Sequence, residues 1–202
     1  MLQELERIIK EILGNQDKIL SNINCESICI YLFLKNEHEK DNIKNNTLFQ
    51  FVFRSYYKLD NAGLGDDIKD FYFKLLTKKK NDLGSILLEL YKFPNRKGQN
   101  TIQFSFATKL LHTLDNNNPI FDAEVSDVIH KKRTGETKRE KVKSCIEIYE
   151  YLKQMYSNLL KDSKVKKVIL KFRKRFNVSE SKISDIKALD FIIWSLGKVK
   201  RK

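Results

Sequence analysis

Residues that break regular structure are scarce in this sequence. Its 202 residues include only 7 glycines and 2 prolines, which leaves few sites for tight turns and favours helices. No run of apolar residues approaches the roughly 20 that a membrane-spanning helix needs. The first 13 residues alternate charged and apolar side chains and lack the apolar core of a secretion signal. We therefore expect a cytoplasmic protein that does not bind a membrane.

Cysteine and histidine are also rare, with three of each. An odd number of cysteines argues against a disulfide framework, and none of the spacings is typical of a metal site. We therefore expect no metal and no other cofactor. Cys25 and Cys29 lie four residues apart on an expected helix. A metal-binding pair is one interpretation, but we favour a buried face of small apolar side chains.

Basic charge is abundant and unevenly placed. Residues 1–122 contain 17 Lys+Arg and 16 Asp+Glu, whereas residues 123–202 contain 22 and 10. Such an excess is typical of chains that bind a polyanion, because each neutralised phosphate releases a counterion. The alternative is a basic surface that serves only solubility. We expect DNA as the partner, with its backbone contacted by Lys131, Lys132, Arg133, Lys166, Lys167, Lys171, Arg173, Lys174 and Arg175.

Apolar residues recur every three or four positions along nearly the whole chain, which predicts an all-α fold. We expect residues 1–202 to form one multi-helix domain that is stable as a monomer. The expected helices cover residues 2–13, 19–34, 49–57, 68–76, 83–90, 101–114, 138–161, 164–176 and 181–196, with one more opened by Asp122.

Lys109 is the only residue with a formal charge between Gly98 and Leu114. An uncharged helical environment desolvates the ammonium group, which lowers its pKa and makes the neutral amine a usable nucleophile. Schiff-base chemistry needs such an amine. The alternative is that the side chain reaches water or pairs with a carboxylate.

Asp122 follows Pro119, Ile120 and Phe121 and precedes a helix-compatible run, so we expect it to be an N-cap. Backbone N–H groups that bond the carboxylate favour its ionised form, which makes it an acceptor or base at neutral pH. A helix, a short return and a second helix can place Lys109 and Asp122 at one cleft. A purely structural capping role is the alternative.

A lysine in a helix, a loop with proline and an aspartate that opens the next helix resemble the catalytic segment of the helix-hairpin-helix DNA glycosylases. The 8-oxoguanine DNA glycosylase-like branch is most similar, and the resemblance covers Ala107 to Val125. It implies two helical lobes, attack of Lys109 on C1′ of a damaged nucleotide, and assistance by Asp122. The family's glycine-rich turn before the lysine is absent here, where residues 104–108 read FSFAT, and the lysine-to-aspartate spacing is shorter than usual.

Base-removing enzymes flip their target into a pocket with aromatic walls. The candidate substrate-binding residues are Ser105, Phe106, His112 and Phe121. Each phenylalanine could instead belong to the core, and His112 could be a hydrogen-bonded structural residue. We expect Trp194, in the apolar run 191–194, to be core.

Three functions are compatible with these patterns. The first is a DNA glycosylase with abasic-site lyase activity. Its catalytic residues would lie in residues 1–122, and its contacts to the DNA backbone would lie in residues 123–202. The second is a non-catalytic nucleic-acid or nucleotide-binding module of the same fold, for example in stress or phage defence. The third is a helical adaptor that binds another protein.

Overall fold

The computed structural model describes residues 1–40, 43–60 and 63–201. Within these ranges the chain forms eleven α-helices and no strand, apart from isolated bridges between Leu64 and Asn95 and between Pro94 and Asn100. The predicted all-α class is confirmed. None of the described helices is both long enough and apolar enough to cross a bilayer.

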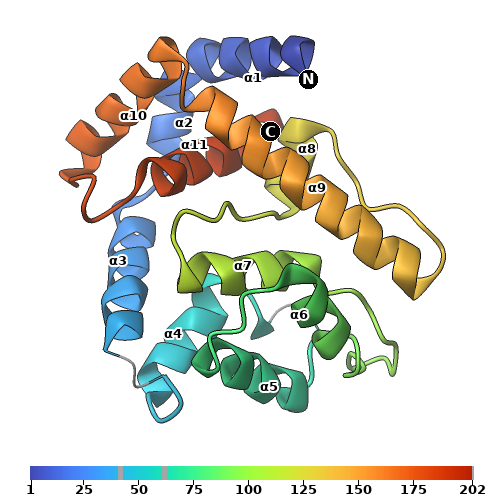
Figure 1. Ribbon diagram of the computed structural model, residues 1–202. Coiled ribbons are helices and arrows are strands. Elements are labelled where there is room, and N and C mark those ends of the chain that lie inside the picture. Colours follow the sequence, from blue (N-terminus) through green and yellow to red (C-terminus); the bar gives the residue numbers. More distant parts are fainter. Residues whose placement is uncertain (41–42, 61–62, 202) are drawn as a thin grey trace.

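The helices, in chain order, are α1 (Leu2–Gly14), α2 (Gln16–Asn22), α3 (Cys25–Glu39), α4 (Thr47–Tyr56), α5 (Asp66–Thr77), α6 (Leu83–Leu90), α7 (Phe104–Leu114), α8 (Ala123–Ile129), α9 (Lys138–Leu159), α10 (Ser163–Phe176) and α11 (Asp185–Lys200). In Figure 1, α4 to α7 gather on one side, and α1, α2, α8, α10 and α11 gather on the other. Helix α9 packs against both α1 and α6, so it joins the two groups.

Helix α11 is the centre of the second group. It packs against α8, α2, α10 and α1, and most of its residues from Ala188 to Leu196 are buried. The contact with α8 is very close, because a Cβ atom built on Gly197 would lie 2.5 Å from the Glu124 carbonyl oxygen. Only glycine allows the two backbones to approach in this way.

The helix predicted over residues 19–34 is wrong, because the structure divides it in two. Helix α2 ends at Asn22, Ile23 is extended, and Asn24 caps α3 by accepting the Ser27 N–H at 2.8 Å. Asparagine is a favoured N-cap, since its side chain satisfies a backbone donor that has no partner inside the helix. The prediction followed the apolar periodicity and overlooked this cap.

The predicted burial of Cys25 and Cys29 is also wrong. Both side chains are exposed in the first turns of α3, whereas Cys145 is buried. In the parts of the chain that the structure describes, no group of three or more potential ligands could hold a metal ion.

Candidate functional site

Lys109 lies half-buried on α7. Its Nζ donates a hydrogen bond to the Tyr57 carbonyl at 3.1 Å and lies 4.9 Å from the centre of the Phe106 ring. Burial lowers the pKa of Lys109 to about 8; nearby Asp122 opposes this shift, and the Lys58 ammonium adds to it. At pH 7 about a tenth of the side chain is therefore neutral, far more than for an exposed lysine. A lowered pKa of Lys109 is what its uncharged sequence neighbourhood predicts.

Asp122 is the N-cap of α8, where its carboxylate accepts the Val125 N–H at 2.9 Å. Burial raises the pKa of Asp122 to about 6 and outweighs the lowering effect of this hydrogen bond. The Val125 bond favours the ionised form, as expected from the sequence, but burial has the larger effect, which the sequence did not indicate. The carboxyl group is still mostly ionised at pH 7, so it can act as an acceptor or base.

Lys109 and Asp122 line the same cavity, which has a volume of about 540 Å³. Its walls come from the α2–α3 junction, the end of α4, α7, the start of α8, and α11. Each side chain hydrogen-bonds to a backbone group rather than to the other side chain. Their opposite charges still attract one another, and this attraction raises the pKa of Lys109. The volume is within the range of small-molecule sites.

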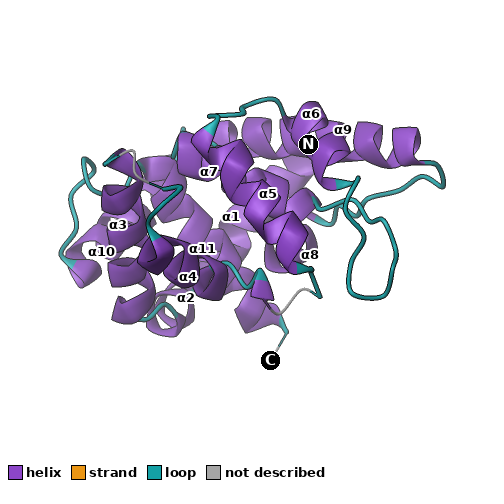
Figure 2. Cartoon of the chain, turned by 90° about the horizontal axis from the view of Figure 1, so that it is seen from below, coloured by secondary structure: helices purple, strands orange, loops and turns teal. Residues whose placement is uncertain are grey.

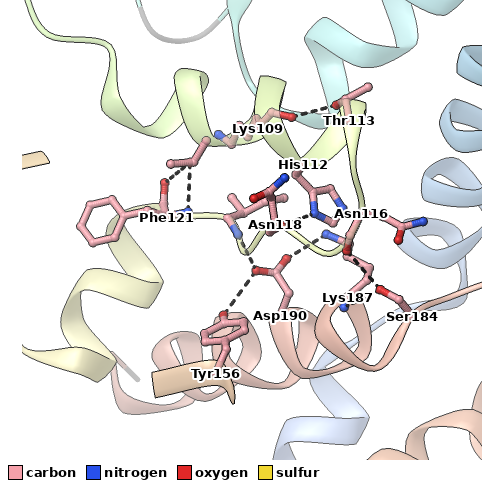
Figure 3. A network of polar contacts seen from close by, with 12 residues as sticks. Lys109, His112, Thr113, Asn116, Asn118, Phe121, Tyr156, Ser184, Lys187 and Asp190 are labelled. Atoms are coloured by element: carbon pink, nitrogen blue, oxygen red, sulfur yellow. Dashed lines mark hydrogen bonds and ion pairs between the residues drawn. The ribbon is translucent and has the colours of Figure 1, made fainter. Parts of the chain in front are cut away.

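The segment between α7 and α8 is held at several points, as Figure 3 shows. The Asn118 carbonyl lies 2.7 Å from His112 Nδ1, and the Thr108 hydroxyl oxygen accepts the Phe121 N–H at 3.0 Å. The Ser184 hydroxyl donates to the Asn116 carbonyl at 3.1 Å. These bonds fix the backbone immediately before Asp122.

Two cavity residues that the sequence analysis missed are Lys187 and Asp190 on α11. The Lys187 Nζ lies 2.8 Å from the Asp190 carboxylate, and both side chains are buried. Asp190 also accepts the Ile120 N–H at 3.2 Å. Opposite charges three residues apart, directly before the apolar run of residues 191–194, were the available signal.

The four predicted substrate-binding residues have different positions. Ser105 lines the cavity, and Phe106 is buried against the Lys109 ammonium. Phe121 does not line it and stacks on Phe104, with ring centres 4.4 Å apart. His112 lines a separate hollow of about 210 Å³.

The aromatic walls of the cavity come from Tyr56, Tyr57, Phe191 and Trp194. The expectation that Trp194 is core is wrong, because its ring is half-buried and faces the cavity beside the Lys198 ammonium, 3.9 Å from the ring centre. Tryptophan suits such a place, since its large ring can contact an apolar ligand surface and leave its N–H for a polar partner.

None of the nine predicted backbone-contact residues lines this cavity. Arg133 donates to the Ile102 carbonyl, and Arg173 pairs with Asp185. Lys131 and Lys132 line another hollow, of about 880 Å³.

The remaining members of the set are exposed on α10: Lys166, Lys167, Lys171, Lys174 and Arg175. In Figures 1 and 2, α10 and the α8–α9 connection lie at opposite ends of the molecule.

Comparison of the chain with protein-family models, curated proteins and solved structures found no match. Function is therefore inferred from the residues of the cavity.

Proposed function

We propose that this protein is a DNA glycosylase with associated abasic-site lyase activity, and that Lys109 forms the Schiff base. The observation that carries the proposal is a half-buried amine with a pKa of about 8 in a cavity that also holds the Asp122 carboxylate. An amine nucleophile and a nearby carboxylate are the two groups that this chemistry needs. The α7–α8 segment then corresponds to the catalytic segment that it resembles in sequence, with the remaining helices forming the two lobes of that fold.

In the proposed reaction a damaged nucleotide leaves the DNA stack and enters the cavity. Asp122 accepts a proton from the Lys109 ammonium, and the neutral amine attacks C1′. The bond between C1′ and the base breaks, and the base leaves with the bonding electrons and takes up a proton. Opening of the sugar ring gives a protonated Schiff base. The proton that the base takes up comes from Asp122, and ring opening moves one proton of the attacking nitrogen to O4′. The regenerated Asp122 carboxylate then offsets the positive charge of the Schiff base.

The Schiff base then supports strand cleavage. Its positive charge makes the C2′ proton acidic, and loss of that proton forms a C2′–C3′ double bond as the C3′–O bond breaks. The phosphate departs with the electrons of that bond. Hydrolysis of the remaining imine returns Lys109 to its free form.

A non-catalytic nucleic-acid or nucleotide-binding module is the second candidate, and the backbone before α7 favours it. The nearest glycine upstream of Lys109 is Gly98, which has a positive φ of 74° but lies eleven residues away. Residues 104–108 lie within α7 itself and offer no glycine turn to hold a phosphate through its N–H groups. This module would bind nucleic acid with a steep salt dependence that survives removal of Lys109.

Borohydride trapping distinguishes the two candidates. Wild-type protein incubated with duplexes that contain an abasic site or 8-oxoguanine should yield a covalent adduct after reduction. Lys109→Gln should yield none, whereas Lys74→Gln, which removes an exposed lysine of α5, should match wild type. Asp122→Asn keeps a capping side chain and should slow adduct formation by about 100-fold or more.

The absence of an adduct with wild type, or equal adduct with Lys109→Gln, would overturn the proposal. Salt-dependent DNA binding that is equal in wild type and Lys109→Gln would then support the binding module.

The pH dependence gives a second test. Only the neutral amine attacks, and its fraction rises from about a tenth at pH 7 to about half at pH 8 because the Lys109 pKa is about 8. The initial rate of trapping on abasic-site DNA should therefore rise about fivefold over this interval. A rate that keeps rising tenfold per pH unit beyond pH 9 would indicate an ordinary exposed lysine.

A further inference from the structure

The reaction proposed above leaves one buried ion pair without a role. The side chains of Lys187 and Asp190 are 3% and 7% exposed, and both line the cavity of Lys109. Two charges taken out of water are costly to the fold, and apolar residues of similar size at such a place are often at least as stable. Stability alone is therefore a weak reason for the presence of this pair beside the cavity.

Asp190 connects α11 to the segment that carries Asp122. Its Oδ1 accepts the Ile120 N–H at 3.2 Å and the Tyr156 hydroxyl at 3.4 Å, and its Oδ2 accepts from Lys187. Ile120 is two residues before Asp122. Figure 3 shows the Asp190 carboxylate pointing from α11 toward this segment, with Lys109 on the other side of the segment. The position of the Asp122 backbone therefore depends on α11.

The Lys187 ammonium lies 4.9 Å from the centre of the Tyr31 ring and 4.5 Å from that of Phe191. These rings and Asp190 hold it in one place at the cavity.

The two members of the pair act on different groups of the site. The charges that act on Lys109 are Asp122 and Glu124 of the α8 start, Lys58 after α4, and Lys187 of α11. Those that act on Asp122 are Glu124, Lys109 and Asp190. Lys187 repels the charged form of Lys109, and Asp190 repels the charged form of Asp122. Both repulsions favour the neutral amine and the neutral acid.

We propose that Lys187 and Asp190 are positioning residues for the Lys109 reaction: Asp190 fixes the segment that carries Asp122, and Lys187 holds a second ammonium group beside the Lys109 cavity. This inference rests on the proposed function, because it assigns the pair to the same reaction.

Two double variants test it. A single replacement leaves one buried charge without its partner and endangers the fold, so both charges are removed together. Lys187→Met with Asp190→Asn keeps an acceptor for the Ile120 N–H, whereas Lys187→Met with Asp190→Leu does not. Each variant is measured at its own optimum pH, and the Leu variant should form the borohydride adduct at least tenfold more slowly than the Asn variant. Circular dichroism establishes that both are folded.

The pH profile separates this role from a merely structural one. In both variants the midpoint of the pH profile that belongs to Lys109 should move up, and the one that belongs to Asp122 should move down. A pair that only supports the fold would leave both midpoints unchanged.

A readout without DNA keeps this test separate from the proposed function. Lysines methylated with ¹³C-formaldehyde are titrated by NMR, and the Lys109 signal is assigned from its loss in Lys109→Arg. Its midpoint should be higher in the Asn variant than in wild type, and the Ile120 amide should exchange faster in the Leu variant.

If wild type forms no DNA adduct, the proposed function fails while these measurements still apply. Unchanged Lys109 midpoints in the folded variants, or an unchanged Ile120 exchange rate in the Leu variant, would overturn the positioning role.

Discussion

Two titratable groups, the buried His112 and the half-buried Asp122, respond to acid in opposite senses. Burial lowers the pKa of His112 from 6.5 to about 4 and raises that of Asp122 from 3.8 to about 6. Between pH 6.5 and 4 the unfolded chain binds a proton at His112 that the folded chain does not, so acid destabilises the fold there. At Asp122 the folded chain binds the extra proton between pH 6 and 4, so acid stabilises it.

Replacement of either residue should reveal the response of the other. We expect the unfolding free energy of Asp122→Asn to fall relative to wild type as the pH decreases from 6 to 4, by up to about 3 kcal/mol. His112→Asn should show the opposite trend relative to wild type. Urea unfolding followed by circular dichroism at several pH values between 4 and 7 measures both. Variant curves that run parallel to the wild-type curve would contradict the shifted pKa values.

His112 also illustrates a side chain whose environment only the structure gives. The Asn118 carbonyl can only accept, so Nδ1 of the neutral ring carries the proton and Nε2 has a free lone pair. Nε2 is buried without a hydrogen-bond partner. The sequence allowed His112 either to line the site or to be structural, and the structure places it in a different hollow from Lys109.

At the scale of helices, the close contact between α8 and α11 depends on Gly197. The Glu124 carbonyl carbon would lie 2.9 Å from a Cβ atom at this position, and backbone cannot rotate away as a flexible side chain can. Gly197→Ala should lower the unfolding free energy by about 1–3 kcal/mol. Because α8 begins directly after Asp122, the variant should also slow adduct formation.

Gly14→Ala provides the matched control. A Cβ atom there meets nothing within 4 Å, so this change should leave stability unchanged or increase it by less than about 1 kcal/mol. Urea unfolding of both variants compares them directly. Equal stability of the two would show that α8 and α11 are not in close contact at Gly197.

The sequence predicted the all-α class and most of the helices because their apolar periodicity is local. It also predicted that Asp122 caps a helix and can share a cleft with Lys109, since an N-cap and a helix–loop–helix order are local patterns. It could not identify the role of Asp190, whose partner Ile120 is 70 residues away. The exposure of Cys25 and the cavity-facing side of Trp194 likewise depend on contacts between helices that periodicity does not specify.

Across the whole molecule, the exposed lysines predicted to contact a DNA backbone fall into two separate parts. One part consists of exposed lysines of α10, and the other consists of Lys131 and Lys132 in the α8–α9 connection. Helix α10 and this connection lie at opposite ends of the molecule, with α11 and α8 between them (Figures 1 and 2). If DNA crosses the cavity between these ends, it contacts both parts. A long polyanion would then be bound at two separated points rather than by one basic patch.

Matched double variants test this arrangement. Lys166→Gln with Lys167→Gln removes two charges from α10, and Lys131→Gln with Lys132→Gln removes two from the other end. Each should reduce the slope of log affinity against log salt concentration by about 2, and the reductions should add when the variants are combined. Fluorescence anisotropy with a labelled duplex measures these slopes. A change in only one of the two variants would show that DNA does not reach the other end.

The bonds from α11 to the α7–α8 segment also bear on how the protein is made. Ser184 and Asp190 bind backbone groups 68 and 70 residues earlier in the chain. During synthesis, Lys109 leaves the ribosome long before the residues that fix the segment carrying Asp122. A chain that stops short of α11 would therefore contain the amine without the placed carboxylate. Under the proposed function, premature termination should yield an inactive product.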